Sequence, residues 1–143
     1  MNDLNYGLKK LCDRNQDGSF ATRANRQGML TMMGNQLREM GYQHMHVESL
    51  KQKHVEALLS KWSMEGVAVG TIKNRMCALR WWSEKIGKQN VVAKSNESYG
   101  ISKRTFVTNV SKAKVLDAEK LAHITDPYTV MSLKLEAAFG LRR

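Results

Sequence analysis

The chain has few of the residues that break helices or link distant segments covalently. It contains one proline in 143 residues, and this scarcity favours an all-α protein. Its two cysteines, Cys12 and Cys77, are too few and too far apart for a disulfide scaffold, so a reduced, cytoplasmic protein is the default expectation. The first fourteen residues are polar and hold no apolar segment typical of a secretory signal.

Familiar catalytic and metal-binding motifs are also missing. His44, His46 and His54 have no spacing typical of zinc ligands with either cysteine. The sequence contains no phosphate-binding glycine loop, no dinucleotide fingerprint and no Ser/His/Asp arrangement. We therefore expect no metal site, no cofactor and no small-molecule substrate.

Acidic residues are scarce relative to basic ones. The chain has 23 Lys and Arg against 13 Asp and Glu, a formal net charge of +10 and a pI of about 9.8. This balance favours a nucleic-acid partner. An anionic membrane is the competing partner, but the chain has neither a long apolar run nor a basic amphipathic helix with bulky apolar anchors.

The sequence does contain a series of amphipathic helices, of which the clearest spans 67–87. Its apolar residues recur at helical spacing and predict one buried stripe: Ile72, Met76, Leu79, Trp82 and Ile86. The opposite side carries mostly long polar side chains: Lys73, Asn74, Arg80, Trp81 and Lys85. On pattern alone this side is the solvated surface of a core helix. The second interpretation is a face that enters a DNA groove.

Further helices are predicted before this one. A short helix over 2–12 precedes a long helix from Ser19 to about Met40, in which Gly28 and Gly34 either permit close packing or interrupt the helix near Gly28. Another helix starts at Ser49 or Lys51 and ends before Gly66. The expected buried stripes of these two longer helices are Leu30, Met33, Leu37 and Met40, and Val55, Leu58, Leu59 and Trp62. Together the helices predict a compact bundle of roughly ninety residues.

The pattern changes after this bundle. Residues 88–114 show no sustained period, and residues 85–114 carry seven Lys or Arg against one acidic residue. This predicts a flexible linker that is solvated or lies along phosphates. Asp117 then caps a short helix over 118–124, and Asp126-Pro127 starts another over 128–140. That last helix is apolar on most sides and should be largely buried. Little chain follows to cover it, so the sequence is expected to stop partway through a domain.

Two stretches resemble one family. GVAVGTI…ALRWWSEKIG (66–87) is similar to the fourth helix of the core-binding domain of tyrosine recombinases and phage-type integrases, and VLDAEKLAHI…GLRR (115–143) resembles the opening of their catalytic domain. The resemblance implies a four- to five-helix SAM-like bundle whose two long helices dock across the major groove of duplex DNA. It also implies four divisions: an N-terminal helix and turn (1–18), a core-binding domain (19–88), a basic linker (89–115) and the beginning of a catalytic domain (116–143).

Gly140-Leu141-Arg142 matches the first catalytic box of this family. The resemblance implies that Arg142 holds the scissile phosphate and stabilises charge in the transition state. The family's hairpin lysine, His-x-x-Arg box and nucleophilic tyrosine do not follow it. We therefore expect a fragment that binds DNA without cutting it. The implied parent recombinase, from a phage or another mobile element, works through a 3′-phosphotyrosyl intermediate and assembles as a tetramer on DNA.

The candidate DNA contacts lie on two helices and in the linker: Thr22, Arg23, Arg26, Thr71, Lys73, Asn74, Arg80, Lys103, Arg104, Lys112 and Lys114. By complementarity to base edges, Asn74 can read adenine and Lys73 can read guanine, whereas the linker residues are phosphate contacts. Two other functions remain open. One is a helical DNA-binding regulator or accessory factor without recombinase parentage, and the other is a basic protein–protein adaptor, which would have no salt-dependent affinity for DNA.

Overall fold

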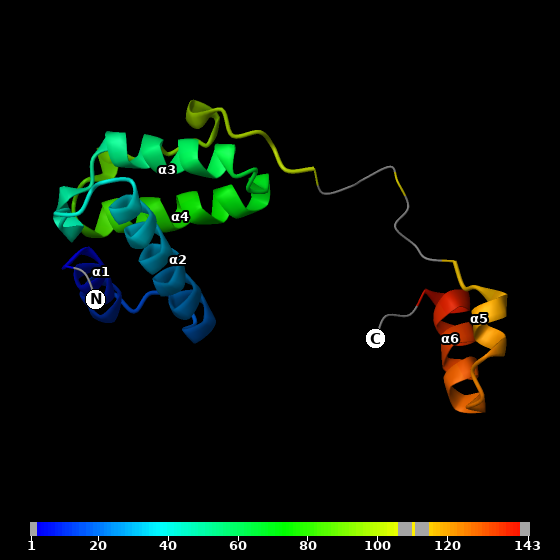
Figure 1. Cartoon of the computed structure of the whole chain (residues 1–143). Helices are drawn as coiled ribbons and strands as arrows, with labels where there is room; N and C mark the ends of the chain where they lie inside the picture. The colour runs from blue at the N-terminus through cyan, green and yellow to red at the C-terminus, as the bar shows by residue number, and fades with distance from the viewer. Residues whose placement is uncertain (1–2, 106–109, 111–114, 141–143) are drawn as a thin grey trace. The chain divides into compact units, whose positions relative to one another are not determined.

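Helices follow one another along the described part of the chain (Figure 1). The protein is described from a computed structural model that defines residues 3–105, 110 and 115–140. The α-helices are α1 (Asp3–Arg14), α2 (Phe20–Glu39), α3 (Gln52–Met64), α4 (Val69–Lys85), α5 (Ala118–Ala122) and α6 (Pro127–Phe139). Short 3-10 helices are η1 (Val47–Ser49), η2 (Gln89–Val91) and η3 (Glu97–Tyr99). These residues contain no strand, which confirms the all-α prediction.

The chain divides into two compact units, Met1–Arg104 and Thr105–Arg143. In the first unit α3 and α4 lie side by side, and α2 crosses them (Figure 1). Each helix turns its predicted stripe inward, because burial removes these apolar side chains from water. The fully buried side chains of the three stripes are Leu30, Met33 and Leu37, Val55, Leu58 and Trp62, and Met76, Leu79 and Trp82. The predicted stripes are thus confirmed, with Met40, Leu59 and Ile86 half-buried at their edges.

Two buried tryptophans also tie elements together through their indole N–H groups. Trp62 of α3 donates to the side-chain oxygen of Gln36 on α2 at 2.9 Å. Trp82 of α4 donates to the backbone carbonyl of Val47 in η1 at 2.9 Å. Since an unpaired buried N–H is costly, these bonds select the arrangement in which both are satisfied.

Helix α1 packs against α2 at a glycine. A Cβ atom on Gly34 would lie 2.1 Å from Oδ1 of Asn5, so the two helices approach closely only because Gly34 has no side chain. The same expectation for Gly28 is wrong, because a Cβ there would meet nothing within 4 Å. Helix α2 also runs through Gly28 without interruption.

The residues directly after α4 pack on the bundle. Val92 is buried, and the backbone N–H of Ala93 donates to the hydroxyl of Tyr99 at 2.8 Å. This segment, predicted as the beginning of a linker, therefore covers part of α4. The four predicted domain boundaries themselves stay predictions.

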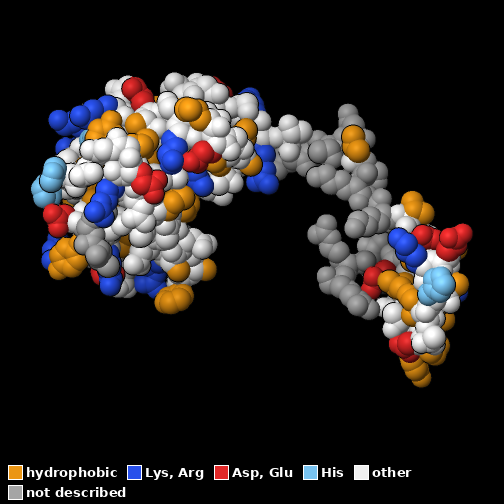
Figure 2. Space-filling model, viewed as in Figure 1, with side chains coloured by type: hydrophobic (Ala, Val, Ile, Leu, Met, Phe, Trp, Pro, Cys, Tyr) orange, Lys and Arg blue, Asp and Glu red, His pale blue; other side chains and the backbone are white. Residues whose placement is uncertain are grey.

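The second unit begins its helices where the sequence predicts. Asp117 accepts from the backbone N–H of Glu119 to cap α5, and Asp126 accepts from those of Tyr128 and Thr129 to cap α6. The expected burial of α6 is not found among the described residues, where none of its side chains is buried. Its large exposed side chains are Tyr128, Met131, Leu135 and Phe139, and Figure 2 shows hydrophobic side chains on the surface of this unit.

Candidate nucleic-acid interface

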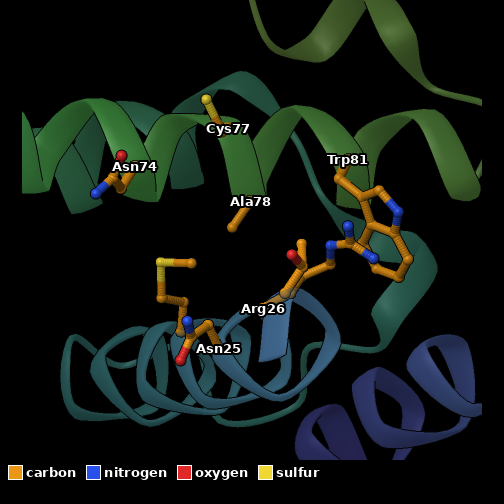
Figure 3. A pocket seen from close by; sticks show the side chains of 8 residues that line it. Asn25, Arg26, Asn74, Cys77, Ala78 and Trp81 are labelled. Carbon is orange, nitrogen blue, oxygen red and sulfur yellow. The ribbon is translucent and has the colours of Figure 1, made fainter. Parts of the chain in front are cut away.

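A groove of about 590 Å³ separates the amino-terminal half of α2 from α4. Four side chains from each helix line it: Thr22, Asn25, Arg26 and Met29 from α2, and Asn74, Cys77, Ala78 and Trp81 from α4. Both sets follow the same i, i+3, i+4, i+7 spacing, which places each set on one face of its helix. We call this site the α2–α4 groove (Figure 3).

The α2–α4 groove is polar at its rim and apolar at its base. Thr22, Asn25 and Asn74 are exposed, whereas Ala78 is buried between the helices. Among its described lining residues Arg26 is the single charged side chain. The groove therefore offers hydroxyl and amide groups together with one cation, which is the set of donors and acceptors that base edges and phosphates require.

Arg26 and Trp81 join the two walls of the groove. The guanidinium carbon of Arg26 lies 4.5 Å from the centroid of the Trp81 ring, and Figure 3 shows the two side chains pointing toward one another. Arg26 also donates to the backbone carbonyl of Asp17 at 3.2 Å. Trp81 was expected to be exposed, but the ring is half-buried because Arg26 covers it.

Asp17, in the loop between α1 and α2, closes this end of the groove. Its carboxylate accepts from the indole N–H of Trp81 at 3.0 Å and pairs with the ammonium of Lys85 at 2.8 Å. The bonds from Lys85 and Trp81 hold the pKa of the Asp17 carboxyl below its usual value. The carboxylate is therefore ionised at neutral pH.

The remaining α2 candidates are held by local contacts. The hydroxyl of Thr22 lies 2.9 Å from that of Ser19, which also caps the helix. Arg23 donates to the side-chain oxygen of Gln16 at 2.8 Å, and its guanidinium lies 5.7 Å from the centroid of the exposed Phe20 ring. Arg23 is therefore beside the groove and does not line it.

The α4 candidates separate into two groups. Asn74 lines the α2–α4 groove, and the exposed Thr71 and half-buried Lys73 precede it on the first turns of α4 without lining it. Arg80 lies elsewhere, because it donates to the backbone carbonyl of Ala93 at 2.9 Å and to the side-chain oxygen of Asn96 at 2.6 Å. Its guanidinium thus fixes the segment after α4, and the expectation that it shares a flank with Asn74 is not met.

The linker and catalytic candidates are only partly described. Lys103 is exposed, and the guanidinium of Arg104 lies against the first turn of α4, 3.3 Å from where a Cβ on Gly70 would stand. Lys112, Lys114 and Arg142 lie outside the described residues.

Metal and membrane sites were not expected. The described residues contain no group of three or more His, Cys, Asp or Glu side chains that could hold a metal ion. Within the same part of the chain, no helix combines the length and the apolar character needed to cross a bilayer.

Comparison with protein families assigns the bundle that carries this groove to a known family. Residues 1–92, more than half of the chain, match the family described as phage integrase, N-terminal. The chain belongs to this family. The match spans α1 to α4 and therefore includes both walls of the α2–α4 groove. Comparisons with curated proteins and with solved structures gave no match.

For this phage integrase N-terminal domain, membership indicates a DNA-binding role in recombination, with DNA as the partner. The resemblance to tyrosine recombinases is thereby confirmed at the level of the family. Sequence reasoning missed Asn25 and Asp17 as members of the candidate interface. The helical spacing of Asn25 from Thr22 and Met29 could have identified it, because the other lining residues follow the same spacing. No sequence pattern identifies Asp17, because a loop places it beside Trp81.

Proposed function

We propose that the chain is the DNA-binding portion of a site-specific tyrosine recombinase or integrase, and that it binds duplex DNA at the recombination site through the α2–α4 groove. The observation that carries this proposal is the convergence of Thr22, Asn25 and Asn74, from two helices far apart in sequence, on one open groove beside Arg26. Family membership supports DNA as the ligand.

The roles of these residues follow from their chemistry. Asn25 and Asn74 carry amides that can pair with the N6 and N7 edge of adenine. Arg26 is half-buried against Trp81, so its guanidinium is partly preorganised for a phosphate or a guanine. In this proposal the DNA backbone is contacted by Thr22 in the first turn of α2 and by Thr71 and Lys73 in the first turns of α4. It is also contacted by the exposed Lys103 and by Arg104, which lies against the first turn of α4.

The proposal extends to the parent activity through the resemblance of its carboxyl-terminal stretch. Arg142 would hold the scissile phosphate of a strand that is cleaved and rejoined through a 3′-phosphotyrosyl intermediate. Lys112 and Lys114 would contact phosphates of the bound DNA. The tetrameric assembly of the parent on DNA belongs to the same proposal.

A salt titration of duplex binding tests the groove. We expect log K for the wild-type chain to fall linearly with log[salt], and Arg26→Gln to reduce the slope by about 0.9, the value for one phosphate contact. Asn74→Ala should leave the slope unchanged and weaken the preference among duplex sequences by about 1–3 kcal/mol. Arg38→Gln, an equal charge change at the other end of α2, is the matched control. Absence of binding at low salt would refute the proposal.

The two cysteines provide an independent measurement. Cys77 is exposed on α4 and lines the groove, whereas Cys12 is half-buried, and burial raises the pKa of its thiol. Alkylation should therefore modify Cys77 first, because the thiolate is the reactive form. Bound duplex should slow the modification of Cys77 and leave that of Cys12 unchanged. Equal protection of both thiols would place the duplex elsewhere.

A further inference from the structure

A second basic surface lies among α1, η1 and the end of α4. A cleft of about 590 Å³ opens there, which we call the α1 cleft. Its charged lining consists of four cations and one carboxylate: Lys10, Arg14, Lys85, Lys88 and Glu48. None of these residues is among the individual DNA contacts named from the sequence, although Lys85 and Lys88 belong to the basic stretch expected to lie along phosphates. None of them lines the α2–α4 groove.

Most of the positive charge in the α1 cleft is not neutralised within the described part of the chain. Of the four cations, Lys85 alone has an ion pair there, with Asp17. Lys10 lies over an aromatic ring of its own helix, 4.5 Å from the centroid, and Lys88 donates to the backbone carbonyl of Glu48. These contacts hold the ammonium groups at the cleft without removing their charge.

This distribution suits an extended polyanion better than a small anion. A small anion is held best at the amino end of a helix, where backbone N–H groups point at it. The α1 cleft is instead bordered by Arg14 and Lys85, which belong to the last turns of α1 and α4, and the carbonyl ends of helices repel anions. Binding there must depend on several long cationic side chains along an open surface, as it does for the evenly spaced phosphates of a duplex.

The α1 cleft adjoins the α2–α4 groove. Lys85 lines the cleft and bonds to Asp17, and Asp17 bonds in turn to Trp81, which lines the groove. A bound duplex long enough to extend past Trp81 in this direction would carry its next phosphates toward the cleft. The two sites can therefore bind successive segments of one duplex.

We infer that the α1 cleft binds the phosphates of the DNA that flanks the segment in the α2–α4 groove. This inference rests on the proposed function. It assigns α1 a second role besides packing on α2, as a contact that depends on duplex length and is independent of base sequence.

The experiment compares two duplexes. One is just long enough to occupy the α2–α4 groove, and the other is extended on both sides. The cleft variant is Lys10→Gln with Arg14→Gln, since both side chains are exposed on α1. The control variant is Arg38→Gln with Lys53→Gln, which removes the same charge from residues that line neither site. Thermal unfolding of both variants establishes that they are folded.

For the wild-type chain, the extended duplex should bind more tightly and with a steeper salt slope than the short one. The cleft variant should lose roughly threefold to tenfold affinity for the extended duplex and reduce its salt slope by about 1–2, while its affinity for the short duplex changes no more than that of the control. An unchanged affinity for the extended duplex overturns the inference and leaves the groove intact. If the wild-type chain binds neither duplex, the proposed function fails and the inference fails with it.

Discussion

The indole N–H of Trp81 donates a 3.0 Å hydrogen bond to the carboxylate of Asp17, which precedes it by 64 residues. The same carboxylate oxygen pairs with Lys85 at 2.8 Å. One acidic residue in a loop thus engages two donors at the point where the α2–α4 groove meets the α1 cleft. A negative charge at this position opposes the approach of phosphates to both sites.

Replacing Asp17 with Asn should therefore strengthen duplex binding. The substitution removes the carboxylate and releases the ammonium of Lys85, so the affinity at low salt should rise and the salt slope should steepen by about one phosphate contact. The matched control is Asp13→Asn, which removes the same charge from the exposed surface of α1. Equal effects of the two substitutions in a binding titration would attribute the gain to net charge rather than to the position of Asp17.

Arg80→Gln should reduce stability rather than DNA affinity. Its guanidinium holds the backbone carbonyl of Ala93 and the side chain of Asn96, and hydrogen bonds from a charged donor contribute about 1.5–3 kcal/mol each. We expect the free energy of unfolding in urea to fall by about 3 kcal/mol, the lower end for two such bonds because Arg80 is only half-buried, with an unchanged salt slope for duplex binding. A reduced slope with unchanged stability would instead make Arg80 a DNA contact, as the sequence pattern predicted.

Replacing each of the two glycines inside α2 with alanine should change the stability of the protein in opposite directions. Gly34→Ala places a Cβ atom against Oδ1 of Asn5, so the buried Asn5 side chain or α1 itself must shift and the protein should lose stability. Gly28→Ala enters open space on the helix surface and should gain up to about 1 kcal/mol from helix propensity. Thermal unfolding of the two variants side by side measures both effects. A loss at Gly28 equal to that at Gly34 would contradict the packing described between α1 and α2.

The helices and their buried faces could be predicted because both depend on local periodicity. The spacing of Met76, Leu79 and Trp82 alone identifies the face of α4 that must leave water. The contacts made by the opposite face could not be predicted in the same way. The sequence predicts both Arg80 and Asn74 as surface hydrogen-bond donors. Arg80 instead donates to the backbone carbonyl of Ala93, because the segment after α4 folds back onto that helix.

Contacts that join distant segments were the part that sequence reasoning could not supply. No pattern connects Asp17 to Trp81, because the loop position is set by how α1 packs on α2. The same is true of Gly34 and Gly28, which look alike in sequence and differ only in whether another helix lies opposite.

Stability should fall as the pH is lowered through the range in which His54 titrates. His54 is buried at the start of α3, where its Nδ1 accepts from the backbone N–H of Lys51 at 3.0 Å and its ring meets that of Tyr42 edge to face. Burial first, and then the charges of Lys53 and Lys51, lower its pKa from the usual value of 6.5. The folded state therefore disfavours the proton that the unfolded chain accepts.

The sign of the effect follows from this difference. Between the lowered pKa and 6.5 the unfolded chain binds more protons than the folded one, so the free energy of unfolding decreases as the pH falls from 6.5 toward that lowered value and levels off below it. Urea unfolding at pH 7.5 and at pH 5.5 should show this loss in the wild-type chain. His54→Gln, which keeps a hydrogen-bond acceptor and cannot titrate, should lose less stability between the two pH values, whereas His44→Gln, a change at an exposed histidine, should behave like the wild type. If His54→Gln and the wild type lose equal stability, protonation of His54 does not weaken the fold, and other groups account for the pH dependence.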